Sequence, residues 1–160
     1  MAKLKRQALI HFVDATLGKD TPTWFKIGQD IEEMSVALNP EVEVKENIWN
    51  ETSISDKGYK PQLEVTPYYA NPTDAIYEPL KEIAMQRKSG DDCKTKYLEV
   101  IIEDASAASH EAYQEDCIIK PTSYGGGTDG VEIPYTIYPN GNRVKGTVTI
   151  TGGVPTFKAN

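Results

Sequence analysis

Apolar and polar residues alternate along most of this chain, which is the pattern of half-buried β-strands. Ala8, Ile10 and Phe12, for example, would share one face of a first strand, because alternate residues of a strand point to opposite faces. The alternation recurs in segments 24–27, 33–38, 41–44, 62–66, 97–102, 113–119, 131–137, 144–151 and 154–157. Asn140-Gly141 predicts a tight hairpin turn before the last strands. We therefore predict a mainly β protein of roughly eight strands, arranged as an antiparallel β-sandwich.

One segment changes to the 3.6-residue period of a helix. Its apolar residues lie about one helical turn apart: Ile76, Leu80, Ile83 and Ala84. Asn71-Pro72 is typical of a helix start, and Gly90 of a helix end. We therefore predict one α-helix around residues 73–89, on the flank of the sandwich. Pro79 leaves two alternatives, a kink in this helix or a second helical piece that starts after Glu78.

Two of the predicted strands are separated by an unusually long polar segment. It runs from about residue 47 to residue 60 and has no helical period. Ordinary hairpin loops have about 2–5 residues, and longer ones usually carry function or are disordered. We therefore expect a long, functional hairpin loop at about 47–60. Ile48, Trp49 and Ile54 are its apolar residues, and an exposed tryptophan is a typical interface hot spot. The alternative is that Trp49 folds back onto its own core.

Composition and charge narrow the function classes. The 160 residues suggest a single domain covering 1–160, and the 39% hydrophobic content is that of a globular protein. The net charge of −7, with no basic patch, argues against binding to DNA or to an anionic membrane. No apolar run approaches the roughly 20 residues of a membrane span. Cys93 and Cys117, without a signal peptide, indicate reduced thiols of an intracellular protein.

The histidines and cysteines do not have the spacing of a catalytic or metal site. His11 falls in an alternating strand and His110 in a polar turn region, so structural or surface roles are expected for both. Cys93 and Cys117 are too far apart in sequence for a Cys-x-x-Cys metal motif. We therefore predict no metal and no cofactor.

The glycines and carboxylates do not form an enzyme signature either. A phosphate-binding loop would need Gly-Lys-Ser/Thr after the glycine run at 125–127, but Thr128 and then a strand follow. We expect a flexible hairpin loop there instead. Glu41 and Glu43 would point the same way on one strand, whereas paired catalytic acids face each other across a cleft. The sequence therefore predicts no catalytic residues and favours an assembly role over an enzyme.

The order of these elements and three short stretches carry a family resemblance over nearly the whole chain. The stretches are Gly-Tyr-Lys-Pro at 58–61, Gly-Asp-Asp at 90–92 and Gly-Asn-Arg-Val-Lys-Gly at 141–146. With them, the chain resembles the major tail protein, or tail tube protein, of long-tailed phages and prophages of Gram-positive bacteria. That resemblance implies a structural virion protein of the siphovirus type, made in the bacterial host cytoplasm.

The resemblance also implies an assembly. Each subunit would be a β-sandwich flanked by one helix, six subunits would close into a hexameric ring, and stacked rings would form a hollow tube. DNA would pass through the lumen during ejection without specific binding. The implied partners are other copies of the chain and the tail-tip, tape-measure and tail-terminator proteins. No membrane partner is implied.

Two sets of residues acquire roles from this resemblance. The long loop would reach from one ring to the next through Ile48, Trp49, Asn50, Ile54, Lys57 and Tyr59. An acidic or neutral lumen lets a polyanion slide, whereas basic residues would hold phosphates. The polar sides of the strands flanking the loop are our candidates for the lumen lining: Glu41, Glu43, Gln62, Glu64 and Thr66. The alternative is that these side chains face outward.

A carbohydrate-binding or adhesion β-sandwich module is the alternative function. Its aromatic residues could stack on sugars, and the candidates are Tyr68, Tyr69, Tyr124, Tyr135 and Tyr138. Such modules are usually secreted, and the chain shows no signal peptide at its start. An unrecognised hydrolase that uses a carboxylate pair is a second, less favoured alternative.

Overall fold

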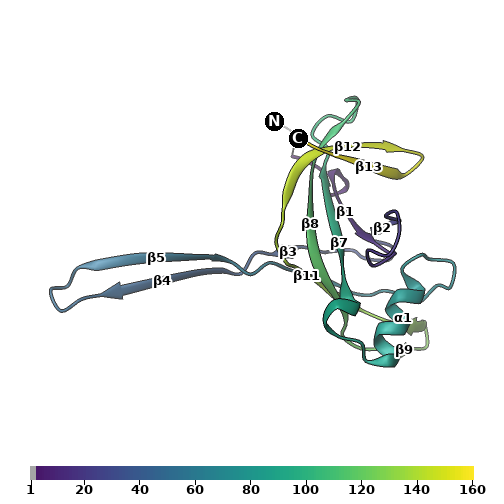
Figure 1. Cartoon of the computed structure of the whole chain (residues 1–160), viewed down its shortest axis with the longest axis horizontal. Coiled ribbons are helices and arrows are strands. Elements are labelled where there is room, and N and C mark those ends of the chain that lie inside the picture. The colour runs from purple at the N-terminus through teal and green to yellow at the C-terminus, as the bar shows by residue number, and fades with distance from the viewer. Residues whose placement is uncertain (1–2) are drawn as a thin grey trace.

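The computed structural model describes residues 3–160, and the chain folds into a β-rich body from which one β-hairpin projects (Figure 1). The strands are β1 (Leu9–Asp14), β2 (Trp24–Ile27), β3 (Val36–Ala37), β4 (Pro40–Glu46), β5 (Thr52–Tyr59), β6 (Gln62–Val65), β7 (Lys94–Ile101), β8 (His110–Pro121), β9 (Gly125–Gly127), β10 (Gly130–Glu132), β11 (Tyr135–Pro139), β12 (Val144–Thr151) and β13 (Val154–Ala159). The helices are α1 (Tyr77–Gln86) and two short 3-10 turns, η1 (Arg6–Ala8) and η2 (Gly90–Cys93).

A nine-stranded antiparallel sheet forms the body, in the order β2-β1-β7-β8-β11-β6-β3. β8 is long enough to pair with two strands on the same side. Its first residues pair with β12, which carries β13, and its last residues pair with β11. The sheet curls around helix α1 at one end, while the β12–β13 hairpin lies at the other (Figure 1). The predicted mainly antiparallel, sandwich-like β fold with one flanking helix is confirmed.

The two faces of the central strands supply two hydrophobic clusters. Val13 and Tyr97 belong to a large cluster that also contains Leu80 of helix α1. Phe12 and Leu98, the neighbours of these residues in sequence, belong to a smaller cluster with strands β8 and β12. Successive strand residues point to opposite faces, so neighbouring residues enter different clusters. This is the alternation seen in the sequence.

The helix is shorter than predicted and begins at Tyr77 rather than near residue 73. The Asn71 side chain instead stabilises a separate turn, where its Oδ1 accepts hydrogen bonds from the backbone and hydroxyl of Thr73. Pro79 lies in the first turn of α1. The first N–H groups of a helix have no partner within the helix, so proline is tolerated there. At the other end, Arg87 has a left-handed backbone with φ 54°, and its Nη1 donates to the Ala84 carbonyl at 2.6 Å.

The prediction of a hairpin turn at Asn140-Gly141 is wrong. β11 and β12 do not pair with each other, because both run antiparallel to the same strand, β8. The chain bulges outward between them while it continues along β8. The backbone N–H of Asn140 donates to the carbonyl of Asp116, and the N–H of Asp116 donates to the carbonyl of Gly141. Gly141 therefore lies in a bulge rather than in a hairpin turn, and the Asn-Gly sequence suits both structures.

The long loop expected at about 47–60 is also wrong, because residues 52–59 form strand β5. β5 pairs with β4 in a sheet of its own, and only the connecting residues 47–51 form a turn. β6 pairs with β11 and β3, so it is not the hairpin partner of β4. The segment has the sequence pattern of a loop because it lacks a run of core residues. A strand outside a core does not need apolar core residues, because the hydrogen bonds to its partner strand come from the backbone.

Candidate assembly site

A two-stranded ribbon, which we call the arm, extends from the body between residues Pro40 and Tyr59 (Figure 1). Within residues 3–160, its strands β4 and β5 pair only with each other. The last registered pair at the root is Pro40 with Tyr59, and the outermost is Glu46 with Thr52. An isolated two-stranded hairpin is marginally stable in water, so such a ribbon is typically completed by a partner.

One face of the arm, which we call the apolar face, carries three exposed apolar residues, and Asp56 lies on it opposite Val42. Val44 lies directly opposite Ile54 in the strand register, and Val42 lies two residues from Val44 on the same face. Val44 is 62% exposed and Ile54 is 70% exposed. All three residues are β-branched, which suits a strand, but they have no core to enter. Their exposure on a projecting element is a property of interaction surfaces.

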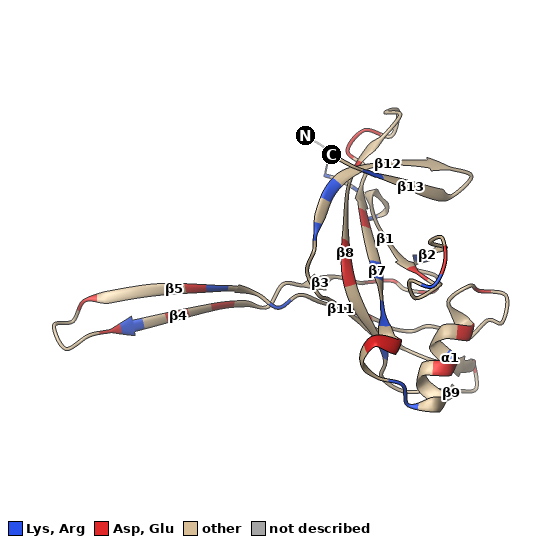
Figure 2. Cartoon of the chain, in the orientation of Figure 1, with Lys and Arg blue, Asp and Glu red and all other residues tan. Residues whose placement is uncertain are grey.

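The opposite face of the arm is polar and carries ion pairs. Glu43 accepts from Lys57 at 2.9 Å and from Lys45 at 3.3 Å. Nearer the root, Lys60 pairs with Glu41 at 2.9 Å. Figure 2 shows acidic and basic segments side by side along both strands of the arm. Exposed pairs of this kind contribute little stability, but they mark this face as the one that suits water.

The tip of the arm is held in one conformation by Asn47. Its Oδ1 accepts hydrogen bonds from the backbone N–H groups of Trp49 and Glu51, both at 2.9 Å. Asn50 has a positive φ of 61°, which asparagine tolerates better than most residues. This turn presents Ile48 and Trp49 outward, with 92% and 75% of their surfaces exposed. A preorganised tip loses little entropy when it binds a partner.

The six residues predicted for the inter-ring contact all lie on the arm, but on different parts of it. Ile48, Trp49 and Asn50 form the tip, and Ile54 lies on the apolar face. The other two are Lys57, which pairs with Glu43 on the polar face, and Tyr59 at the root. The apolar face adds Val42 and Val44. The sequence pattern places both in the alternating segment 41–44 and does not show that this strand lies outside the body.

The five residues predicted to line a lumen do not lie together in one chain. Glu41 and Glu43 are on the arm. Gln62 and Glu64 are on β6 in the body, and Thr66 follows that strand. Glu64 is exposed between buried neighbours Leu63 and Val65, so it faces away from the core. Any common wall would have to be built from more than one copy of the chain.

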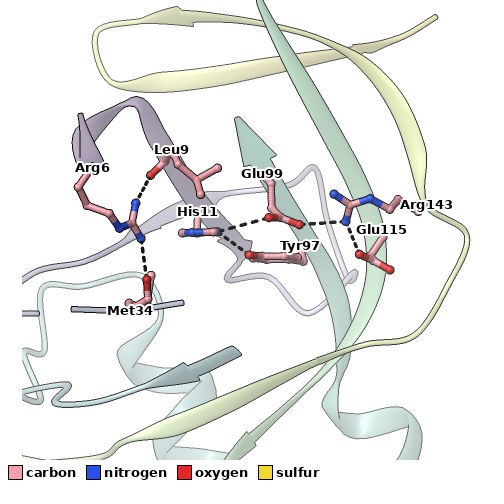
Figure 3. Close-up of polar contacts among 8 residues, drawn as sticks. All are labelled: Arg6, Leu9, His11, Met34, Tyr97, Glu99, Glu115 and Arg143. Atoms are coloured by element: carbon pink, nitrogen blue, oxygen red, sulfur yellow. Dashed lines mark hydrogen bonds and ion pairs between the residues drawn. The ribbon is translucent and has the colours of Figure 1, made fainter. Parts of the chain in front are cut away.

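A polar cluster at the edge of the larger core was not foreseen. It joins His11, Tyr97, Glu99, Glu115 and Arg143 from strands β1, β7 and β8 and from the segment before β12 (Figure 3). Arg143 Nη1 donates to Glu99 Oε1 at 2.9 Å and also to Glu115 Oε1. Burial opposes the charge of Arg143, but these hydrogen bonds outweigh it and raise the pKa of its guanidinium. Alternation could have placed each residue on its strand, but not across from the others.

His11 is buried in this cluster, in agreement with the predicted structural role. Its ring stacks on Tyr97, and its Nδ1 is hydrogen bonded to the Tyr97 hydroxyl. Burial, with a smaller contribution from the Arg6 guanidinium, lowers the pKa of His11 to about 4. Glu99 lies 3.8 Å from Nδ1, but its charge is shared with Arg143, so burial dominates and the imidazole is neutral near pH 7.

The remaining candidate residues do not gather into a second site. Tyr68 and Tyr135 are buried in the core, so they cannot stack on a sugar together with the exposed Tyr124 and Tyr138. Cys93 and Cys117 are free and buried, and burial raises the pKa of the Cys117 thiol. Across residues 3–160, no three His, Cys, Asp or Glu side chains come together as metal ligands.

No protein-family model and no curated protein sequence matches the chain. In the part of the chain that the structure describes, no helix has the length and apolar composition needed to cross a bilayer.

Proposed function

We propose that this protein is a structural subunit that assembles with copies of itself, as a tail tube protein does. The observation that carries the proposal is the arm, a preorganised ribbon whose apolar face and tip are uncovered in residues 3–160. A catalytic or ligand-binding role would not require such an element. Assembly accounts for the arm, because a second copy would cover its apolar face and add to its two-stranded sheet.

The tube arrangement is the form of assembly that the sequence resemblance favours. In it, subunits close into hexameric rings through their bodies, and the arm joins one ring to the next. The conduit serves DNA ejection from the virion, and tail-tip, tape-measure and tail-terminator proteins set its ends and length. The net charge of −7 supports a channel through which DNA passes without binding.

A matched pair of substitutions on strand β5 tests the role of the arm. Ile54→Lys puts a charge on the apolar face, whereas Ser55→Lys puts the same charge one residue further on, on the polar face. We expect the native chain and Ser55→Lys to form rings or hollow rods in negative-stain electron microscopy. We expect Ile54→Lys to form no rods and to sediment as nothing larger than a single ring at the same concentration, because a charge buried at the contact between rings without a partner is costly.

Circular dichroism would confirm that both variants are folded. Native protein that stays monomeric up to millimolar concentration, also with crowding agents or a tail-tip nucleus, would refute the proposal. So would rods that form equally well from Ile54→Lys and from Ser55→Lys, since the apolar face would then have no part in assembly.

A further inference from the structure

A cleft opens on the body beside the root of the arm. Its volume is about 660 Å³, within the range of pockets that bury a ligand of drug size. Apolar side chains line much of it, among them Leu9, Met34, Val36 and Leu38. The polar cluster with His11, Glu99 and Arg143 borders the same space. This is the composition of a site for an apolar anchor that carries polar groups at its edge.

The two arginines beside the cleft, Arg6 and Arg143, have different hydrogen-bond partners. Arg6 donates to the backbone carbonyls of Leu9 and Met34, at 2.6 and 3.1 Å, and pairs with no carboxylate in residues 3–160. Arg143 bonds both of its carboxylates through Nη1. A guanidinium has five N–H donors, so Arg6 can bind a carboxylate, whereas the charge of Arg143 is already balanced by Glu99 and Glu115, which also line the cleft.

The tip of the arm has the complementary chemistry. Ile48 and Trp49 are exposed apolar groups, and Glu46 and Glu51 flank them in sequence. Neither glutamate has an ion-pair partner within the described part of the chain, unlike Glu41 and Glu43 nearer the root. An aromatic anchor with neighbouring carboxylates suits an apolar cleft that has the guanidinium of Arg6 at its border.

The tip cannot enter the cleft of its own chain. β4 has seven residues, and a strand rises about 3.3 Å per residue, so the tip is held roughly 20 Å from the root. Leu38, Tyr59 and Pro61, all close to the root, line the cleft. The pairing of β4 with β5 keeps the ribbon extended, so the two surfaces can meet only between two copies.

We propose that this cleft receives the arm tip of a second copy, with Trp49 as the anchor and with a tip carboxylate, Glu46 or Glu51, at Arg6. This inference rests on the proposed self-assembly and names the surface that the arm binds. The contact is heterologous, because a tip on one copy binds a cleft on another. Each copy can therefore give one tip and receive one, which lets the contact propagate.

Disulfide cross-linking between two variants, each with one added surface cysteine, tests the contact. One variant carries Ile48→Cys at the tip and an affinity tag, and the other carries Ser35→Cys, at an exposed residue that lines the cleft. The control partner is Ser123→Cys, exposed near β9 and away from the cleft. The native cysteines are buried, so they do not compete. Mixed dimers are then counted on a non-reducing gel after mild oxidation.

We expect the yield with Ser35→Cys to exceed the yield with Ser123→Cys by about tenfold, because docking raises the local thiol concentration. Adding Glu46→Lys and Glu51→Lys to the tip variant should lower that yield to the control level. Rods that form while the two yields are equal would overturn the cleft as the docking surface and leave self-assembly standing. The absence of both rods and cross-links would overturn self-assembly and, with it, this contact.

Discussion

At the scale of single residues, the surroundings of a side chain change its chemistry or leave it no room. His11 and Gly146 are the clearest cases. His11 is a titratable side chain that is buried, and the backbone of Gly146 lies close against a neighbouring strand. Both lie in the body rather than in the arm, so substitutions there report on the fold and leave the arm tip unchanged.

His11 should make stability depend on pH. Its pKa is about 4 in the folded chain, whereas an exposed histidine has a pKa of about 6.5. The unfolded chain therefore takes up a proton between pH 6.5 and pH 4 that the folded chain does not, and stability falls as pH drops through this window. We expect a loss of about 2 kcal/mol between pH 7 and pH 5 from this residue, measured by urea unfolding.

The comparison of two histidine variants isolates this effect from carboxylates that titrate in the same range. His11→Asn should lose less stability between pH 7 and pH 5 than the native chain does. His110→Asn, at the start of β8, is the matched histidine variant for this comparison. If the native chain and His11→Asn show the same pH dependence, the imidazole does not remain neutral in the fold.

Gly146 should not tolerate even a methyl group. A Cβ at this position would lie 2.7 Å from Cζ of Phe157 and would also collide with the backbone carbonyl of Lys158. Gly146→Ala should therefore push β13 away from β12 and cost about 1–3 kcal/mol in the free energy of unfolding. Gly127→Ala is the control, because a Cβ there meets nothing within 4 Å, and its effect should stay within about 0.5 kcal/mol. Equal effects would show that the β12–β13 contact is not tight.

At the scale of elements, the arm depends on a single turn for its order. Asn47 supplies two side-chain hydrogen bonds to the tip, and no core holds the strands together. Asn47→Ala should therefore speed amide hydrogen exchange in residues 40–59 and leave the body unchanged. Asn50→Gly is the control, since glycine also accepts the positive φ of this position and should preserve the turn. Exchange at native rates in Asn47→Ala would show that the strands order the arm without it.

The elements that the sequence predicted correctly are those whose pattern reflects burial. Alternation located most strands of the body, and the 3.6-residue period located α1, because both patterns record which side chains enter the core. β5 was missed for the opposite reason, since Ser53, Ser55 and Asp56 enter none. Pairing across long distances is also not encoded locally. Nothing in the residues near Asn140 shows that β11 and β12 share β8 as their partner.

The candidate site was predicted in part. Ile48, Trp49 and Ile54 stood out as apolar residues in a polar segment, and the structure leaves all three exposed on the arm. The cleft beside the arm root could not be predicted, because its lining comes from segments as distant as Arg6, Leu38 and Arg143. Only the fold brings such residues together.

At the scale of the whole molecule, the body should fold without the arm. Both hydrophobic clusters consist of body residues, and none of them comes from β4 or β5. Replacing residues 43–55 by Asn-Gly keeps the Val42–Asp56 pair and closes a tight turn. We expect the free energy of unfolding to change by less than about 1 kcal/mol in urea. A loss of several kcal/mol would show that the arm supports its own chain.

The arm also gives direction to anything built through it. It leaves the body on one side only, so a stack of such subunits would have unlike ends, with bare tips at one and vacant clefts at the other (Figure 1). A protein that starts the stack would then need a different surface from one that stops it. The two ends would also add subunits through different surfaces, as a consequence of the shape of the subunit.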